Sequence, residues 1–128
     1  GDVVTFCPPL TPPIRLAQER GYVASGACPG DVEPMLKPVV ALAGDQVAVS
    51  PLGVHVNGRL LPSSAPLIAD SADRPLPILV MTEATVPADS AWVVSSHNPR
   101  SYDSRYVGPI STDSITAVLR PLWTEGAR

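Results

Sequence analysis

Lys37 is the residue of this chain with the clearest potential for chemistry. It is the only lysine among 128 residues, and it stands between Leu36 and the apolar run 38–43. An apolar setting lowers the pKa of an ammonium group by desolvation, and a lysine that is neutral near working pH can act as a general base. A lysine at a strand end can also extend its charge into solvent while its stem covers apolar surface. The residues alone leave both interpretations open.

The segment 101–108 is the second candidate, because it is dense in hydrogen-bonding side chains and ends at a glycine. It reads Ser-Tyr-Asp-Ser-Arg-Tyr-Val-Gly. In a functional interpretation, a serine hydroxyl of this segment and a buried Asp103–Arg105 pair hold a catalytic side chain in place. The alternative is a polar loop with an ordinary acid–base pair.

His97 lies close in sequence to Asp103 and to several serines, which invites a Ser-His-Asp triad. No serine stands in a Gly-X-Ser-X-Gly turn or an equivalent signature, so we interpret His97 as a loop histidine and His55 as part of a hairpin arm. No metal site is predicted, because two cysteines and two scattered histidines offer no Cys-X-X-Cys or His-X-X-X-His spacing. No cofactor is expected.

Composition bounds the class of protein. With 45% hydrophobic and 16% charged residues, the chain is not a disordered tail, and its net charge of −3 gives no nucleic-acid footprint. No apolar run reaches the roughly 18 residues of a membrane span. The sequence opens on Gly-Asp-Val-Val without methionine, so we expect a piece of a longer protein. Cys7 and Cys28, each followed by proline, are either a disulfide or two buried thiols.

Sixteen prolines in one domain of 128 residues favour short strands and many loops, so a mainly β fold with one short helix is predicted. Thr11 at the cap, prolines in the first turn and Gly21 after Arg20 predict the helix. Asn57-Gly58 between two alternating arms predicts a tight hairpin over 53–61. Other strands are expected over 1–7, 35–43, 46–50, 78–82, 91–95 and 115–119, with loops over 22–34 and 62–77.

Together these motifs resemble the conserved boxes of type I signal peptidases. Lys37 leads an apolar strand into Gly44-Asp45, and Ser-X-Asp-Ser-Arg-Tyr-X-Gly follows at 101–108. The Gly-Asp-Asn common before the second box is absent. The pieces Phe-Cys-Pro-Pro at 6–9, Arg-Gly-Tyr at 20–22 and Cys-Pro-Gly at 28–30 are instead similar to the conjugative-transfer peptidases of the TraF type, which mature pilin subunits.

The resemblance implies a signal-peptidase-like Ser/Lys protease β fold over 1–128, with a membrane anchor and the nucleophilic serine upstream of Gly1. Lys37 would be the general base, Ser101 the hydroxyl that positions its amine, and Asp103 with Arg105 the brace of that loop. It implies a Cys7–Cys28 disulfide and a place on the periplasmic face of the bacterial inner membrane. The implied substrate is a pilin precursor or another exported protein, and without the serine this chain would be inactive.

The sequence leaves two alternatives open. The first is a general leader peptidase or a self-cleaving repressor-type protein, which uses the same Ser/Lys mechanism. A non-catalytic β adaptor of a secretion or pilus assembly would use the same scaffold without the chemistry.

Overall fold

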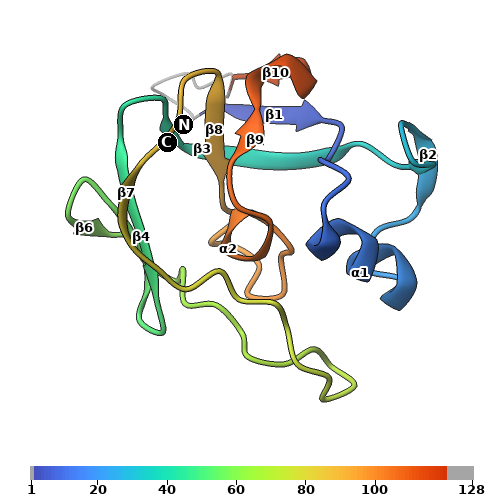
Figure 1. Cartoon of the computed structure of the whole chain (residues 1–128), viewed down its shortest axis with the longest axis horizontal. Coiled ribbons are helices and arrows are strands. Elements are labelled where there is room, and N and C mark those ends of the chain that lie inside the picture. Colours follow the sequence, from blue (N-terminus) through green and yellow to red (C-terminus); the bar gives the residue numbers. More distant parts are fainter. Residues whose placement is uncertain (1, 121–128) are drawn as a thin grey trace, which may run out of the picture.

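The computed structural model describes residues 2–120 and is mainly β (Figure 1). Its helices are α1 (Pro12–Arg20), α2 (Ser104–Val107) and the 3₁₀ turn η1 (Thr112–Ser114). The strands are β1 (Val3–Phe6), β2 (Ser25–Cys28), β3 (Met35–Leu42), β4 (Gln46–Ser50), β5 (Gly53–Val56), β6 (Arg59–Leu60), β7 (Met81–Thr85), β8 (Ser90–Val93), β9 (Ile110–Ser111) and β10 (Ile115–Leu119).

Two antiparallel sheets carry the described chain. One has the strand order β10-β1-β3-β8-β9, and the other has the order β6-β5-β4-β7. The four-stranded sheet lies on the left of Figure 1, α1 and β2 lie on the right, and β3 runs between them. The β5–β6 connection is the predicted tight turn, in which Asn57 and Gly58 take φ angles of 51° and 80°. Both angles are those that a type I′ turn requires.

Strand β3 changes partners at Pro38. Its first half, 35–38, pairs with β1, and its second half, 39–42, pairs with β8. Proline has no N–H to give to a ladder, so a handover between two partners is a position where it is tolerated. The Pro38 carbonyl still accepts from Val94 N at 3.1 Å. Lys37 therefore lies two residues before Val39, where the pairing of β3 with β8 begins.

Strand β8 separates two apolar cores. Ala91 and Val93 pack with α1, β1 and α2 residues, whereas Trp92 and Val94 pack with the four-stranded sheet. Successive strand residues point to opposite faces, so burial on both faces requires an uninterrupted apolar run. The sequence Ala-Trp-Val-Val at 91–94 meets that requirement, and all four residues are buried.

Several local predictions need correction. Residues 22–34 are not all loop, because β2 forms within them and bridges to Val32. The strand predicted over 78–82 is shifted to β7, and β9 and α2 were not predicted. Thr11 precedes α1 as expected, but its hydroxyl makes no cap hydrogen bond and is buried without a partner. Gly21 ends α1 in the left-handed conformation, as predicted.

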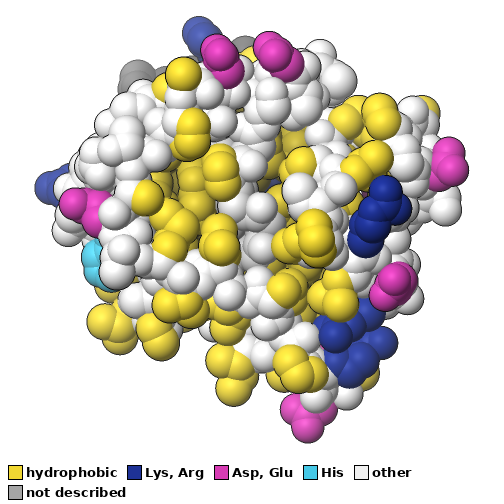
Figure 2. All heavy atoms as spheres, in the orientation of Figure 1, with side chains coloured by type: hydrophobic (Ala, Val, Ile, Leu, Met, Phe, Trp, Pro, Cys, Tyr) yellow, Lys and Arg dark blue, Asp and Glu magenta, His cyan; other side chains and the backbone are white. Residues whose placement is uncertain are grey.

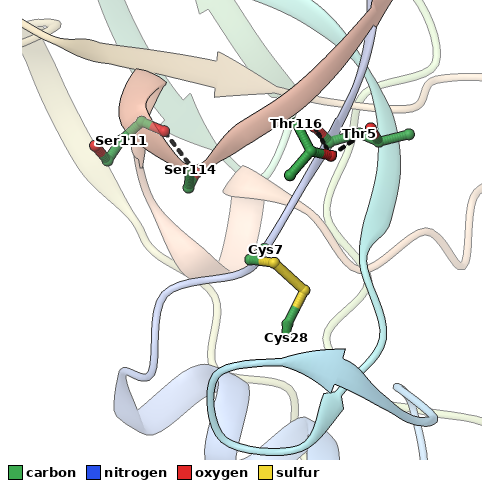
Figure 3. Close-up of a disulfide and its surroundings, with 6 residues drawn as sticks. All are labelled: Thr5, Cys7, Cys28, Ser111, Ser114 and Thr116. Carbon is green, nitrogen blue, oxygen red and sulfur yellow. Dashed lines mark hydrogen bonds between the residues drawn. A yellow bond between two sulfur atoms is a disulfide. The ribbon is translucent and has the colours of Figure 1, made fainter.

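Cys7 and Cys28 form a disulfide, in the pairing that the resemblance implied (Figure 3). The bond joins the chain just after β1 to the end of β2, and so closes the segment that holds α1. Cys7 N also donates to Ser114 O at 3.1 Å. Figure 3 shows a Thr5–Thr116 hydrogen bond beside it, which links β1 to β10. The α1 segment is thus fixed covalently to the five-stranded sheet.

Apolar side chains gather on the face of the molecule seen in Figure 2. The most exposed large ones in the described chain are Ile68 at 79%, Leu52 at 73% and Val80 at 67%. Such surface groups are informative when they form a patch. Within residues 2–120, no helix combines the length and apolar character needed to cross a membrane.

Candidate active site

The two sequence candidates for a base and its positioning hydroxyl meet in the structure. Lys37 Nζ donates to Ser101 Oγ at 2.7 Å, although 64 residues separate them. Lys37 comes from β3, and Ser101 precedes α2 in a turn closed by Ser101 N donating to Asn98 O at 3.0 Å. Ser101 is only 4% exposed, so its hydroxyl has a fixed environment. The amine is held by one short hydrogen bond.

Asp103 and Arg105 form a fully buried ion pair behind Ser101. Arg105 Nε and Nη2 donate to the two Asp103 carboxylate oxygens at 2.9 and 2.8 Å, and both side chains are 0% exposed. Bidentate pairs of this kind are the strongest and most directional that arginine makes. Asp103 also accepts from Arg105 N and Ser95 N at 3.1 and 3.0 Å.

Further Arg105 contacts reach backbone carbonyls. Nη1 donates to Ala65 O at 3.3 Å, and Nη2, which also binds Asp103, donates to Ser95 O and Ser101 O at 3.3 and 3.4 Å. A buried charge is tolerated only when it is paired and its hydrogen-bonding groups are satisfied. This pair meets that condition and, in doing so, fixes the backbone of Ser101. The pair therefore positions the hydroxyl that holds Lys37.

The surroundings of Lys37 favour the neutral form of its amine. Desolvation by burial lowers the pKa of its ammonium group, and Arg105 lowers it further, whereas Asp103 raises it. Desolvation is the dominant cause, so the net shift is downward. A lowered pKa increases the neutral fraction of the amine near neutral pH, which is the form that accepts a proton.

Lys37 and Ser101 open into a cavity of about 350 Å³. Its lining mixes two kinds of side chain. The apolar and aromatic ones are Tyr22, Val23, Met35, Leu36, Leu67, Leu76, Tyr102 and Tyr106, and the other polar or charged ones are Glu33, Asp70, Ser71, Asn98 and Arg100. Sites that bind ligands commonly combine apolar walls with a few convergent polar groups. A perturbed lysine in such a cavity marks a candidate active site.

Sequence reasoning found part of this site and missed the rest. His97 is exposed in the turn before Ser101 and does not line the cavity, and His55 lies in β5. The three tyrosines were not selected, although all three in the chain line the cavity. Aromatic residues make up only 5% of the chain, and this scarcity could have drawn attention to the tyrosines. In residues 2–120, no three His, Cys, Asp or Glu side chains are grouped to hold a metal ion.

Comparison with known proteins identifies the family. The family model described as "Signal peptidase, peptidase S26" matches residues 1–123. The chain belongs to the S26 signal peptidase family. Within it, the chain is 44% identical over 124 residues to the plasmid transfer protein TraF of Escherichia coli, covering 97% of this chain and 70% of that protein.

Other relatives carry related names. A probable conjugal transfer protein TraF of Sinorhizobium fredii (strain NBRC 101917 / NGR234) is 40% identical, with 97% of this chain and 64% of the relative covered. The crystal structure of a signal peptidase I from Enterococcus faecalis V583 covers 93% of both chains with 19% identity and a TM-score of 0.49. The predicted membership of the conjugative-transfer branch of the signal peptidase superfamily is confirmed.

Proposed function

We propose that this chain is the periplasmic part of a Ser/Lys endopeptidase that processes a pilin precursor or another exported protein in conjugative transfer. The single observation that carries the proposal is the 2.7 Å contact between Lys37 Nζ and Ser101 Oγ at a cavity of an S26 family chain. The nucleophile in this proposal is a serine that precedes Gly1 in the longer protein.

The proposed reaction has two stages. The serine hydroxyl attacks the scissile carbonyl while Lys37 takes its proton, and the amine then gives that proton to the leaving nitrogen as the peptide bond breaks. An acyl-enzyme remains, and water or another amine resolves it. An amine base needs no ring orientation, so one positioning hydroxyl and a low-dielectric pocket suffice. Ser101 and the Asp103–Arg105 pair fill these supporting roles.

The proposed location is the periplasmic face of the inner membrane, with an anchor upstream of Gly1. The Cys7–Cys28 disulfide supports an oxidising compartment, because such bonds are rare in the reducing cytosol. The exposed apolar side chains support work close to a membrane surface.

Lys37→Met in the full-length protein tests the proposal. We expect cleavage of the precursor to fall by about 1,000-fold or more, since proton transfer by a positioned base contributes roughly 10²–10⁴. Methionine keeps the length and apolar character of the stem and removes a charge that burial disfavours, so the melting temperature should stay constant or rise. Full activity of Lys37→Met would overturn the dyad.

The pH dependence gives a second readout of the same base. The folded-state pKa of Lys37 is lowered, so the wild-type rate should rise with pH and level off below the pKa of a free lysine. The unfolded chain binds the proton more tightly, so this lysine costs most stability at pH values below its folded pKa. The stability gain of Lys37→Met should therefore shrink as pH rises. No cleavage by the wild-type full-length protein at any pH would favour the adaptor alternative.

A further inference from the structure

The segment 67–76, here called the 67–76 loop, forms part of the cavity wall. It contributes four of the lining residues: Leu67, Asp70, Ser71 and Leu76. The loop is a small hairpin, with Asp70 N donating to Arg74 O and Leu76 N to Ile68 O, both at 2.9 Å. It runs below α2 in Figure 1 as the long connection between β6 and β7. An excursion from the four-stranded sheet thus helps to line the Lys37 site.

The loop is attached to the catalytic side at its base. Leu67 N donates to Tyr106 Oη at 2.9 Å, and Ala65 O accepts from Arg105 Nη1 at 3.3 Å. The other end is attached to the residues around the end of α1. Arg20 Nη1 donates to Pro75 O at 2.7 Å. The loop therefore bridges two elements that also line or support the cavity.

Asp70 is the centre of the second attachment. Its Oδ1 accepts from Ala72 N and Arg74 N at 2.9 and 2.8 Å, which shapes the turn of the loop. Its Oδ2 accepts from Arg74 Nε at 2.7 Å and from the Tyr22 hydroxyl. Arg20 Nη1 lies 3.9 Å away. One carboxylate thus links its own loop to the wall that Tyr22 provides.

The charged form of Asp70 is the form that this network requires. Burial raises the pKa of the carboxyl, but hydrogen bonds from Tyr22, Arg74 and Ala72 outweigh that effect and hold the pKa well below its ordinary value. The side chain is only 7% exposed. Asp70 is too firmly engaged to serve as an acid or base in the reaction, so its contribution must come through the groups that it holds.

The tyrosines held beside this network present rings to the cavity. The Tyr22 and Tyr102 ring centroids lie 5.3 Å apart, and those of Tyr102 and Tyr106 lie 5.1 Å apart with rings 9° from parallel. Tyr102 Oη donates to Pro13 O at 2.7 Å, so all three hydroxyls are engaged within the protein. On this side of the cavity, the rings together with Leu67 and Leu76 offer apolar surface to a bound chain.

We infer that Asp70 is a positioning residue for substrate binding, which holds Tyr22 and the 67–76 loop in the arrangement that binds an apolar stretch of the substrate chain. The inference rests on the proposed peptidase function. It separates two roles within one cavity: Lys37 and Ser101 move and orient a proton, and Asp70 sets how well the substrate is held.

Asp70→Asn in the full-length protein is the test, with Asp73→Asn as the matched control. Asparagine has the shape of aspartate but cannot offer two acceptor oxygens, so the link to Tyr22 is weakened. Asp73 lies in the same turn at φ 61° and is exposed. The Asp73→Asn substitution therefore removes one negative charge from the same turn. We expect KM for the precursor to rise about tenfold in Asp70→Asn, with kcat and the midpoint of the rate–pH profile unchanged. Asp73→Asn should match the wild type.

Tyr22→Phe provides a second variant that keeps the ring and removes the hydroxyl, which donates to Asp70 and accepts from Arg20 Nη1 at 3.1 Å. It should raise KM in the same direction. Amide exchange of Ala72 and Arg74, whose N–H groups bond to Asp70 Oδ1, should accelerate in Asp70→Asn and not in Asp73→Asn. A purely structural effect would lower the amount of active protein and leave KM unchanged.

Binding without turnover separates this inference from the proposed function. In a Lys37→Met background, the dissociation constant of the purified precursor pilin should rise about tenfold with Asp70→Asn. Wild-type protein that cleaves precursor, with equal KM in Asp70→Asn and Asp73→Asn, would overturn the role of Asp70 alone. Wild-type protein that neither binds nor cleaves precursor would overturn the proposed function and this role with it.

Discussion

Two aspartate–arginine pairs hold residues that line the same cavity, and the two pairs differ in exposure. In the pair behind Ser101, the side chains of Asp103 and Arg105 are both 0% exposed. In the 67–76 loop, Asp70 is 7% exposed and its partner Arg74 is 47% exposed. The first pair is enclosed by the core, whereas the second has one partner at the surface. The first region therefore fixes the backbone of Ser101, and the second holds Tyr22 and the 67–76 loop.

Asp103→Ala should have the largest effect and should break the first region. It leaves Arg105 charged and buried without its partner, which costs about 3–5 kcal/mol of unfolding free energy. The cleavage rate should also fall, because the Ser101 backbone loses its support. Asp103 raises the pKa of Lys37, so the midpoint of the rate–pH profile should move to lower pH. Denaturant unfolding and pH-rate measurements check both effects.

A surface control is available for this variant. Asp113 is an exposed acid in η1, and Asp113→Ala should change the free energy of unfolding by no more than about 0.5 kcal/mol. Equal stability losses for Asp113→Ala and Asp103→Ala would show that the buried pair has no special role.

The double variant Cys7→Ser with Cys28→Ser should destabilise the segment between the two cysteines, which contains α1 and Tyr22. Removing a cross-link between residues 21 positions apart should cost about 3 kcal/mol on the loop-entropy model. Lys37 and Ser101 lie outside the closed segment, so the rate–pH midpoint of the folded enzyme should not move. Thermal unfolding with and without reductant checks the loss. A wild-type melting temperature that is insensitive to reductant would contradict it.

The two regions also differ in how well they could be predicted from the sequence. Lys37 and the 101–108 segment were recognisable because each is a contiguous motif, and the family resemblance joined them. The Asp70–Tyr22 link could not be predicted, since its members lie 48 residues apart and Asp70 belongs to no motif. Strong local signals such as Asn57-Gly58 and Gly21 placed their elements correctly. By contrast, β7 begins three residues after the predicted start of its strand. Ile78 and Leu79, which were predicted to lie in the strand, pack against the two cores from a segment outside it.

Ser101→Ala should have the smallest effect, and it distinguishes two meanings of the Lys37–Ser101 contact. If Ser101 positions the amine, removing its hydroxyl leaves the base present but less well oriented, and kcat/KM should fall by about 10 to 100-fold. If Ser101 were itself the nucleophile, the loss would equal that of Lys37→Met.

Ser104→Ala is the matched control for that variant. Ser104 Oγ is fully buried and accepts from Val93 N at 2.9 Å, but Ser104 does not line the cavity. Its loss should cost about 1–3 kcal/mol of stability through an unsatisfied N–H and leave kcat/KM of the folded enzyme unchanged. We expect a slower enzyme for Ser101→Ala and a less stable one for Ser104→Ala. That result would show that two serines three positions apart have different roles, one in positioning Lys37 and one in stabilising the fold.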